Sequence, residues 1–475
     1  MERPLSVLAL ILATVSLTIA ATQNTCDCSP ATAQGTPTET AEMTSPVATP
    51  VQPTPESTTS TTTTPLPVAT ANPAVIDRLV TGIDATAPVP DWQKPQLAVA
   101  GTDPAYGTPV TRLTSAEGTR FNRNTYSRRN PENASGELFF TYHGDATYNV
   151  YDTTSGSLIL VTDIHPDGEP QWHPTNPNIL RHLSGDDSYT GDLALYETDV
   201  TTGQTTIVAD LTPEITAAFG DALYLSDRAE GTPSQDGNRY AWFVFDSNED
   251  VVGVVTVDLS NEIADAPAPV IIGKLSLADL PAGRADFVSA SPTGEHVVLG
   301  GEFGIYAYDF DLTNPTKIHD KAEHSDIAIN ANGQDVYVHV DFSAASETAG
   351  WVVSRNLVTG ETTRFFDLYD DANTSIHFSG KAYDAPGWIV ASTYNCKETA
   401  AWSCEKVFAF NVDTGAIVHL AHTYNCGDSY WTETQAAANR DLSRVYFNSD
   451  GGTCGIDAEV YRLDVPTLTE IPESQ

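Results

Sequence analysis

Residues 322 to 342 read AEHSDIAINANGQDVYVHVDF, which is a histidine, a short apolar run, a polar turn containing glycine and a second apolar run. Short apolar runs separated by Asn, Gly and Asp predict two β-strands joined by a tight turn. Residues 374 to 394, TSIHFSGKAYDAPGWIVASTY, open in the same way. The two stretches therefore predict equivalent units of a repeated structure, with His324 and His377 at equivalent places.

The unit recurs along the chain. Seven openings of this kind occur, each followed by a second half such as YNVYDTTSGSLILV or VFAFNVDTGAIVHL, so that each unit supplies four short strands. Repeated units of short strands with Asn, Asp, Gly and Pro turns are typical of propellers. We predict an all-β fold, a seven-bladed β-propeller with four antiparallel strands per blade, over residues 100–475. Residues 108–114, TPVTRLT, are the expected early strand that closes the last blade.

The N-terminal part has a different composition. Residues 1–22 contain Arg3 and the apolar run LSVLALILATVSLTIAA, which is the plan of a secretory signal peptide. Residues 23–75 are rich in Thr, Ser, Pro and Ala, as expected of a disordered linker that cannot bury a core. We therefore expect a secreted, extracellular protein that is a monomer and has no transmembrane segment in its mature form.

The charge is strongly negative. The chain has 63 Asp plus Glu against 23 Lys plus Arg, a formal net charge of −40. Nucleic-acid binding is disfavoured, because phosphate contacts need clustered Lys and Arg. One basic island stands out, and it holds Arg120, Arg123, Arg128 and Arg129. These arginines are either partners in internal ion pairs or an anion subsite.

The six cysteines of an exported chain suggest disulfides. The local pairing joins Cys396 to Cys404 and Cys426 to Cys454. Spacing alone leaves a bridge between Cys404 and Cys426 open.

Histidines gather at one end of the expected propeller. The loop that enters the first strand of a blade and the hairpin between its second and third strands share one rim. The residues placed there are His143, His165, His182, Arg228, Glu230, His324, His377 and His422. Any single histidine there is as readily explained as a hydrogen-bonding turn residue, but turns have no need of imidazole. Converging imidazoles can bind a transition metal, or one can act as a base while an arginine neutralises a carboxylate.

Several phrases resemble a known group of enzymes. GTPVTRLT, YSRRNPENASGELFF, HSDIAINANGQDVYV and YWTETQAAANRDLSRVYFNSD look like blade openings of secreted seven-bladed propeller lyases, the oligogalacturonate lyases and ulvan lyases. The resemblance covers about residues 100 to 470 through loose blade patterns. It implies β-elimination on a uronic acid-containing polysaccharide or oligosaccharide.

The resemblance also implies site residues. The oligogalacturonate lyase pattern assigns His377 and Gln435 to a divalent metal, Mn or Ca, but Ala438 and Arg440 stand where two more histidines are expected. His324 or His422 could complete the metal shell. The ulvan lyase pattern assigns the catalytic roles to His143, His165, Tyr224 and Arg239. The substrate-binding candidates are Arg128, Arg228, Glu230 and His324. The competing hypothesis is a non-catalytic extracellular propeller that binds a glycan or a protein.

Overall fold

The computed structural model describes residues 81–83, 89–184, 193–260, 270–321, 324–343, 346–368, 374–396, 401–426, 429–455, 457–466 and 468. The predicted signal peptide (1–22), the predicted linker (23–75), Cys26 and Cys28 lie outside these residues. No helix within the described ranges is long and apolar enough to cross a membrane.

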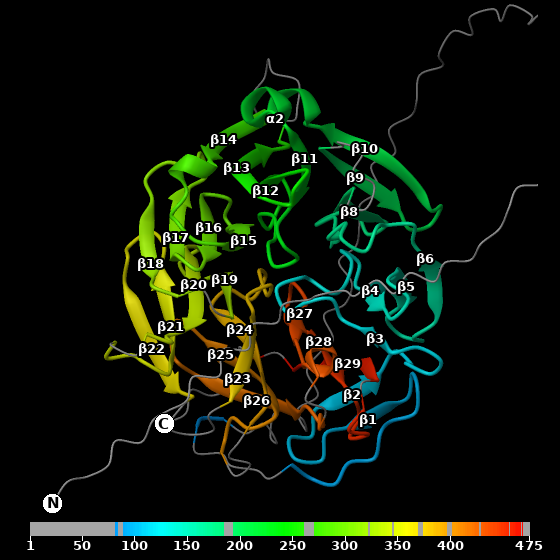
Figure 1. Ribbon diagram of the computed structural model, residues 1–475. Coiled ribbons are helices and arrows are strands. Elements are labelled where there is room, and N and C mark those ends of the chain that lie inside the picture. The colour runs from blue at the N-terminus through cyan, green and yellow to red at the C-terminus, as the bar shows by residue number, and fades with distance from the viewer. Residues whose placement is uncertain are drawn as a thin grey trace, which may run out of the picture. The chain divides into compact units, whose positions relative to one another are not determined.

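Small antiparallel sheets are arranged as a ring (Figure 1). Five of them have four strands each. In chain order these are β7 (Gln171–Trp172), β8 (Ile179–Leu183), β9 (Ala194–Asp199) and β10 (Gln204–Asp210); β11 (Ala222–Ser226), β12 (Arg239–Asp246), β13 (Val251–Asp258) and β14 (Val270–Ser276); β15 (Ala285–Ala290), β16 (His296–Gly301), β17 (Gly304–Asp309) and β18 (Thr316–His319); β19 (Ser325–Ile329), β20 (Asp335–Val340), β21 (Trp351–Asn356) and β22 (Thr362–Asp367); β23 (Ser375–Ser379), β24 (Trp388–Tyr394), β25 (Lys406–Asn411) and β26 (Ile417–His422).

The sixth sheet has nine strands and contains two blades. One consists of β3 (Phe121–Arg123), β4 (Leu138–His143), β5 (Tyr148–Asp152) and β6 (Leu158–Val161), and the other of β27 (Ala437–Ala438), β28 (Arg444–Ser449), β29 (Ala458–Asp464), β2 (Pro109–Arg112) and β1 (Ala100–Thr102). Only two residue pairs between β29 and β3, in parallel, link them. Divided at that link, the strands form seven groups, and the predicted all-β propeller is confirmed.

The ring closes with an early strand. β2 pairs antiparallel with β29, with Val110 opposite Leu463 and Arg112 opposite Tyr461. The segment 108–114 therefore completes the last blade, as the sequence predicted. Figure 1 shows β1 and β2, near the blue end of the colour range, beside the red β29.

Burial explains the strand patterns. Middle strands such as β20 and β25 are buried along their whole length, because each blade packs against its neighbours on both faces. The largest apolar cluster joins the last two blades and includes Val390, Leu420 and Phe447. The outer strand β6 is exposed at three of its four residues. Regular structure outside the strands comprises α2 (Thr212–Phe219), η1 (Leu277–Asp279) and η2 (Tyr430–Thr432) in the described chain.

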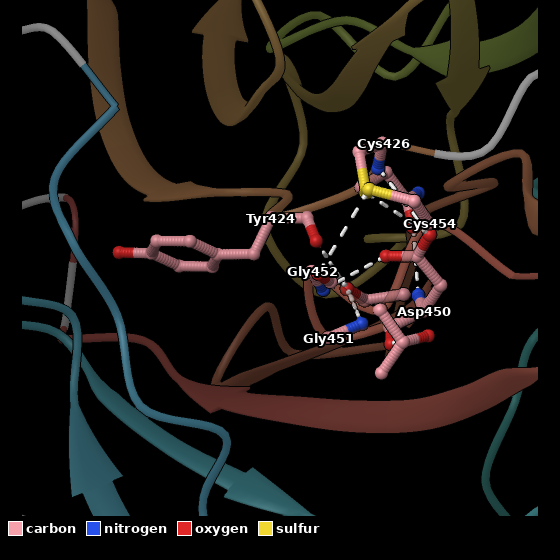
Figure 2. Close-up of a disulfide and its surroundings, with 9 residues drawn as sticks. Tyr424, Cys426, Asp450, Gly451, Gly452 and Cys454 are labelled. Atoms are coloured by element: carbon pink, nitrogen blue, oxygen red, sulfur yellow. Dashed lines mark hydrogen bonds between the residues drawn. A yellow bond between two sulfur atoms is a disulfide. The ribbon is translucent and has the colours of Figure 1, made fainter.

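Both predicted disulfides are present. Cys396–Cys404 closes the hairpin between β24 and β25, with a Cα–Cα distance of 5.4 Å. Cys426–Cys454 joins the loop after β26 to the hairpin between β28 and β29, with a Cα–Cα distance of 4.7 Å. Figure 2 shows the second bond beside Asp450, whose Oδ1 accepts a hydrogen bond from the backbone N–H of Gly452 at 2.8 Å. The alternative bridge between Cys404 and Cys426 is excluded.

Candidate functional site

The two ends of the ring differ in the segments that form them. We call the end where the inner strands (β3, β7, β11, β15, β19, β23 and β27) begin the upper face, and the end where they finish the lower face. Hairpins between second and third strands lie on the upper face, because Asp246 at the end of β12 pairs with Ala222 at the start of β11. The position of each candidate residue is given below relative to these two faces.

Two predicted site histidines meet near the upper face. The rings of His324 and His377 stack with centroids 4.4 Å apart, and His377 also stacks on Tyr394 at 4.7 Å. The Nδ1–H of His324 donates to the carbonyl oxygen of Ile376 at 3.0 Å, which fixes its tautomer. His377 lies inside β23 and is 1% exposed, so its expected place in the preceding loop is wrong. Strand β23 begins at Ser375, two residues before His377.

An acid next to this stack was not predicted from the sequence. Oε2 of Glu433 lies 3.6 Å from Nε2 of His377 and accepts a bond from the Gln435 side chain at 3.5 Å. Burial raises the pKa of Glu433 to about 7, against the opposing influence of Gln435 and Arg123. Burial and the neighbouring His324 lower the pKa of His377. Near neutral pH, His377 is therefore uncharged and Glu433 is partly protonated. The motif ETQ, which puts an acid two residues before Gln435, was the available signal.

The shifted pKa of Glu433 predicts a pH effect on stability. Its native pKa is above the unfolded value of 4.5, so the stability it contributes is present below that value and is lost as the pH rises toward 7. We expect the free energy of unfolding of Glu433→Gln, relative to that of the unaltered protein, to rise by about 2 kcal/mol over this range. Urea titrations at several pH values measure it, with the exposed Glu361→Gln as control. Parallel pH profiles for Glu433→Gln and the unaltered protein would contradict it.

Two arginines of the basic island are internal ion-pair partners. Arg128 contacts Glu230 at 3.1 Å and the Ser325 hydroxyl at 2.9 Å, and its guanidinium lies over the Phe287 ring. Arg129 contacts Asp227 at 3.1 Å. Both arginine side chains are at most 3% exposed, so they tie the segment after β3 to other blades. Arg128 and Arg129 are therefore internal ion-pair partners and not an anion subsite.

The four predicted catalytic residues do not come together. Nδ1 of His143 lies 2.7 Å from Asp145 at the end of β4, and His165 accepts the Asp167 N–H in the loop before β7. Tyr224 stacks on Phe245 within the blade formed by β11 to β14, to which neither histidine belongs. Arg239 begins β12 at the lower face, where it pairs with Asp258 at 3.0 Å. Because Arg239 and Phe245 lie at opposite ends of β12, Arg239 is separated from Tyr224, and the structure does not bring the predicted catalytic set together.

Three further placements differ from expectation. His422 ends β26, the outermost strand of its blade, where its backbone N–H donates to Asp103 and its ring lies 5.1 Å from that of Tyr106. It was expected in a loop on the rim, but β26 extends to His422 itself. Arg228 and Glu230 follow the inner strand β11 instead of preceding it.

An aromatic platform lies on the upper face, and it consists of Phe121, Tyr430 and Trp431. Phe121 and Trp431 stack at 4.5 Å with ring planes 7° apart, and Tyr430 is 54% exposed. The guanidinium of Arg120 lies 5.2 Å from the Trp431 ring centre, and that of Arg123 lies 5.2 Å from the Tyr430 ring centre. Arg123 also donates to the backbone oxygens of Tyr430 and Trp431. Sequence reasoning missed this platform, although YW directly before the Gln435 motif was a signal.

The residues at the predicted metal position do not form a complete set. His377 Nδ1 and Gln435 Oε1 are buried without hydrogen-bond partners, which suits two ligands. Ala438 offers none, and Arg440 donates to the Gln235 carbonyl oxygen at 2.8 Å, by the lower face. The stacked, nearly parallel rings of His324 and His377 direct their nitrogen lone pairs side by side and not toward one point. No group of three His, Cys, Asp or Glu residues suited to a metal occurs in the described chain.

A pocket opens at the lower face. It encloses about 450 Å³, counting its open mouth, and lies between loops from several blades. Its lining includes Gln171, Trp172, Gln235, Lys381, Tyr383 and Arg440. None of the predicted site residues lines it.

Solved structures resemble this chain in fold. The oligogalacturonate lyase of Vibrio parahaemolyticus matches with a TM-score of 0.53 at 12% identity, over 78% of this chain and 96% of that one. An oligogalacturonate lyase in complex with manganese matches with a TM-score of 0.51 at 14% identity, over the same shares. No protein-family model and no curated protein sequence matches the chain. At these identities the likeness shows the β-propeller fold.

Proposed function

We propose that the protein is an exported, non-catalytic propeller that binds a polysaccharide or oligosaccharide on its upper face. The aromatic platform is the observation that carries the proposal. Trp431 stacks on Phe121, the guanidinium of Arg120 lies 5.2 Å from its ring centre, and Tyr430 is largely exposed beside it. Flat aromatic faces suit the apolar faces of sugar rings, and rings already fixed in place lose little entropy on binding. The two disulfides are compatible with an extracellular location.

The centre of the ring supports binding better than catalysis. Cleavage of a uronate by β-elimination needs a cation or a metal to neutralise the carboxylate. Arg128 and Arg129 are buried and already paired with Glu230 and Asp227, and the metal set is incomplete in the described chain. His377 is 1% exposed, so a sugar ring cannot reach it in this conformation.

The platform predicts a loss of binding on substitution. We expect Trp431→Ala to weaken binding to the preferred glycan about tenfold or more, since a lost stacking contact is worth about 1.4 kcal/mol. Titration calorimetry with polygalacturonate, alginate and dextran would measure it. Trp351→Ala is the matched control, because Trp351 also carries a guanidinium, that of Arg364 at 5.2 Å, on another blade. Equal losses in both variants, or none in Trp431→Ala, would contradict the proposal.

A uronate lyase that needs no metal is the second candidate, favoured by the opposed pKa shifts of Glu433 and His377. In such a reaction the site would first have to open to the sugar, and Arg123, the cation beside Glu433, would offset the carboxylate charge while neutral His377 takes the proton next to the carboxylate. Protonated Glu433 would give its proton to the departing glycosidic oxygen as the carbon–oxygen bond breaks and a carbon–carbon double bond forms. Ultraviolet absorbance of an unsaturated product, formed without added metal and lost in His377→Ala, would establish this reading over the first.

A further inference from the structure

One arginine is held in an unusual backbone conformation. Arg228 and Ala229 both have positive backbone φ angles, 61° and 62°, which residues other than glycine rarely adopt. The carboxylate of Glu169 fixes them by accepting bonds from the Ser226 hydroxyl and from the N–H groups of Asp227 and Ala229, at 2.6 to 2.8 Å. Strained backbone that its surroundings hold in place concentrates at functional sites.

The guanidinium of Arg228 makes no ion pair with an acid of the described residues. It lies 5.1 Å from the centre of the Phe245 ring, and its Nε is buried without a hydrogen bond. The described chain gives it no ion pair within 4.0 Å. In a protein with 63 acids and 23 bases, an arginine without an acidic partner is unexpected.

A second unpaired arginine lies close by. Arg284 is exposed, directly precedes β15 at the upper face, and makes no side-chain hydrogen bond or ion pair with the described residues. Its neighbour Ala285 packs in one apolar cluster with Phe245, the ring beneath Arg228. Burial, and next the charge of Arg284, lower the pKa of Arg228, while Tyr224, Asp286 and Glu169 oppose this. The two cations are thus near enough to repel each other.

We propose that Arg228 and Arg284 form a subsite for one anionic group of the glycan, a carboxylate or a sulfate ester. The subsite deepens the proposed function and rests on it. Two guanidiniums that repel each other gain most from an oxyanion placed between them, and each can donate two parallel hydrogen bonds to it. Because the rest of the surface is acidic, a polyanion would be attracted only where such cations gather.

The test compares three polymers and two variants. The probes are polygalacturonate, which carries carboxylates, dextran sulfate, which carries sulfates, and neutral dextran. Arg228→Asn removes the charge with a residue that tolerates positive φ, and Arg284→Gln removes the second charge. Arg355→Gln is the control, a half-buried arginine on β21 bonded to the Thr362 hydroxyl at 3.0 Å. We expect each variant to weaken binding of one charged polymer about tenfold and to leave dextran binding unchanged.

The polymer most affected identifies the anionic group. A melting curve with and without sodium sulfate, at constant ionic strength, gives a second readout. Sulfate should raise the melting temperature of the unaltered protein more than those of Arg228→Asn and Arg284→Gln. Unchanged polyanion binding in both variants, or a protein that responds to no polyanion and not to sulfate, would overturn the subsite. Failure of the platform is distinguishable, because Trp431→Ala would then bind all three polymers normally.

Discussion

Replacing Glu459 by alanine is expected to lower the free energy of unfolding by about 3 kcal/mol, because it removes one partner of a buried charge cluster. Glu459 lies in β29, and its carboxylate is 3% exposed. Its two oxygens contact the Nη2 and Nε of Arg112, both at 2.7 Å, and the Nζ of Lys94, also at 2.7 Å. Oε1 also accepts the backbone N–H of Ala116 at 3.1 Å. The side chain therefore ties the early segment to the last blade, where the ring closes.

Urea unfolding followed by tryptophan fluorescence measures the effect. The exposed Glu361→Ala serves as control and should leave the transition midpoint unchanged. Arg112→Ala should be destabilising as well but by less, because Lys94 still faces the carboxylate. If Glu459→Ala unfolded like the control, the closure would depend on the strand pairing of β2 with β29 alone.

The fold could be predicted because its signals are local and repeated. Alternating apolar runs and turn residues recur in every blade, so a blade with a weakly marked strand is still recognised from the rest of its unit. The inner strands β7 and β27 have only two residues each, and neither would be convincing alone. Helix α2 was missed because it is short, begins with Thr-Pro and buries Ile215 alone, which leaves no helical apolar stripe to find.

The candidate site could be predicted only in part. His324 and His377 do meet, but not from equivalent positions, because His324 directly precedes β19 whereas His377 is the third residue of β23. The alternation of apolar and polar residues does not reveal where a strand ends, so His422 was placed in a loop although it belongs to β26. The contacts of Glu433 and of the platform join residues from distant parts of the chain, such as Phe121 with Trp431. Nothing in the repeat pattern specifies such contacts.

The second large effect concerns a buried ion pair within the ring. Nζ of Lys381 lies 3.0 Å from Oδ1 of Asp326 and donates to the Thr232 hydroxyl at 3.2 Å. The side chains of Lys381 and Asp326 are 2% and 4% exposed. Oδ2 of Asp326 also accepts the backbone N–H of Gly380 at 2.7 Å. Inner strand β19 and the segment after β23 are thereby joined through a single carboxylate.

We expect Asp326→Ala to cost about 3 to 5 kcal/mol, because it leaves the ammonium of Lys381 buried without its counter-charge. Adding Lys381→Met should restore about 1 to 3 kcal/mol, since methionine fills a similar volume without a charge. Denaturant titration of the two single variants and the double variant measures the coupling. The matched control is the exposed pair of Lys317 and Asp320, 2.8 Å apart, where Asp320→Ala should leave the midpoint unchanged because water replaces the lost partner. Additive losses in the double variant would mean that Asp326 acts through its backbone bonds and not through the lysine.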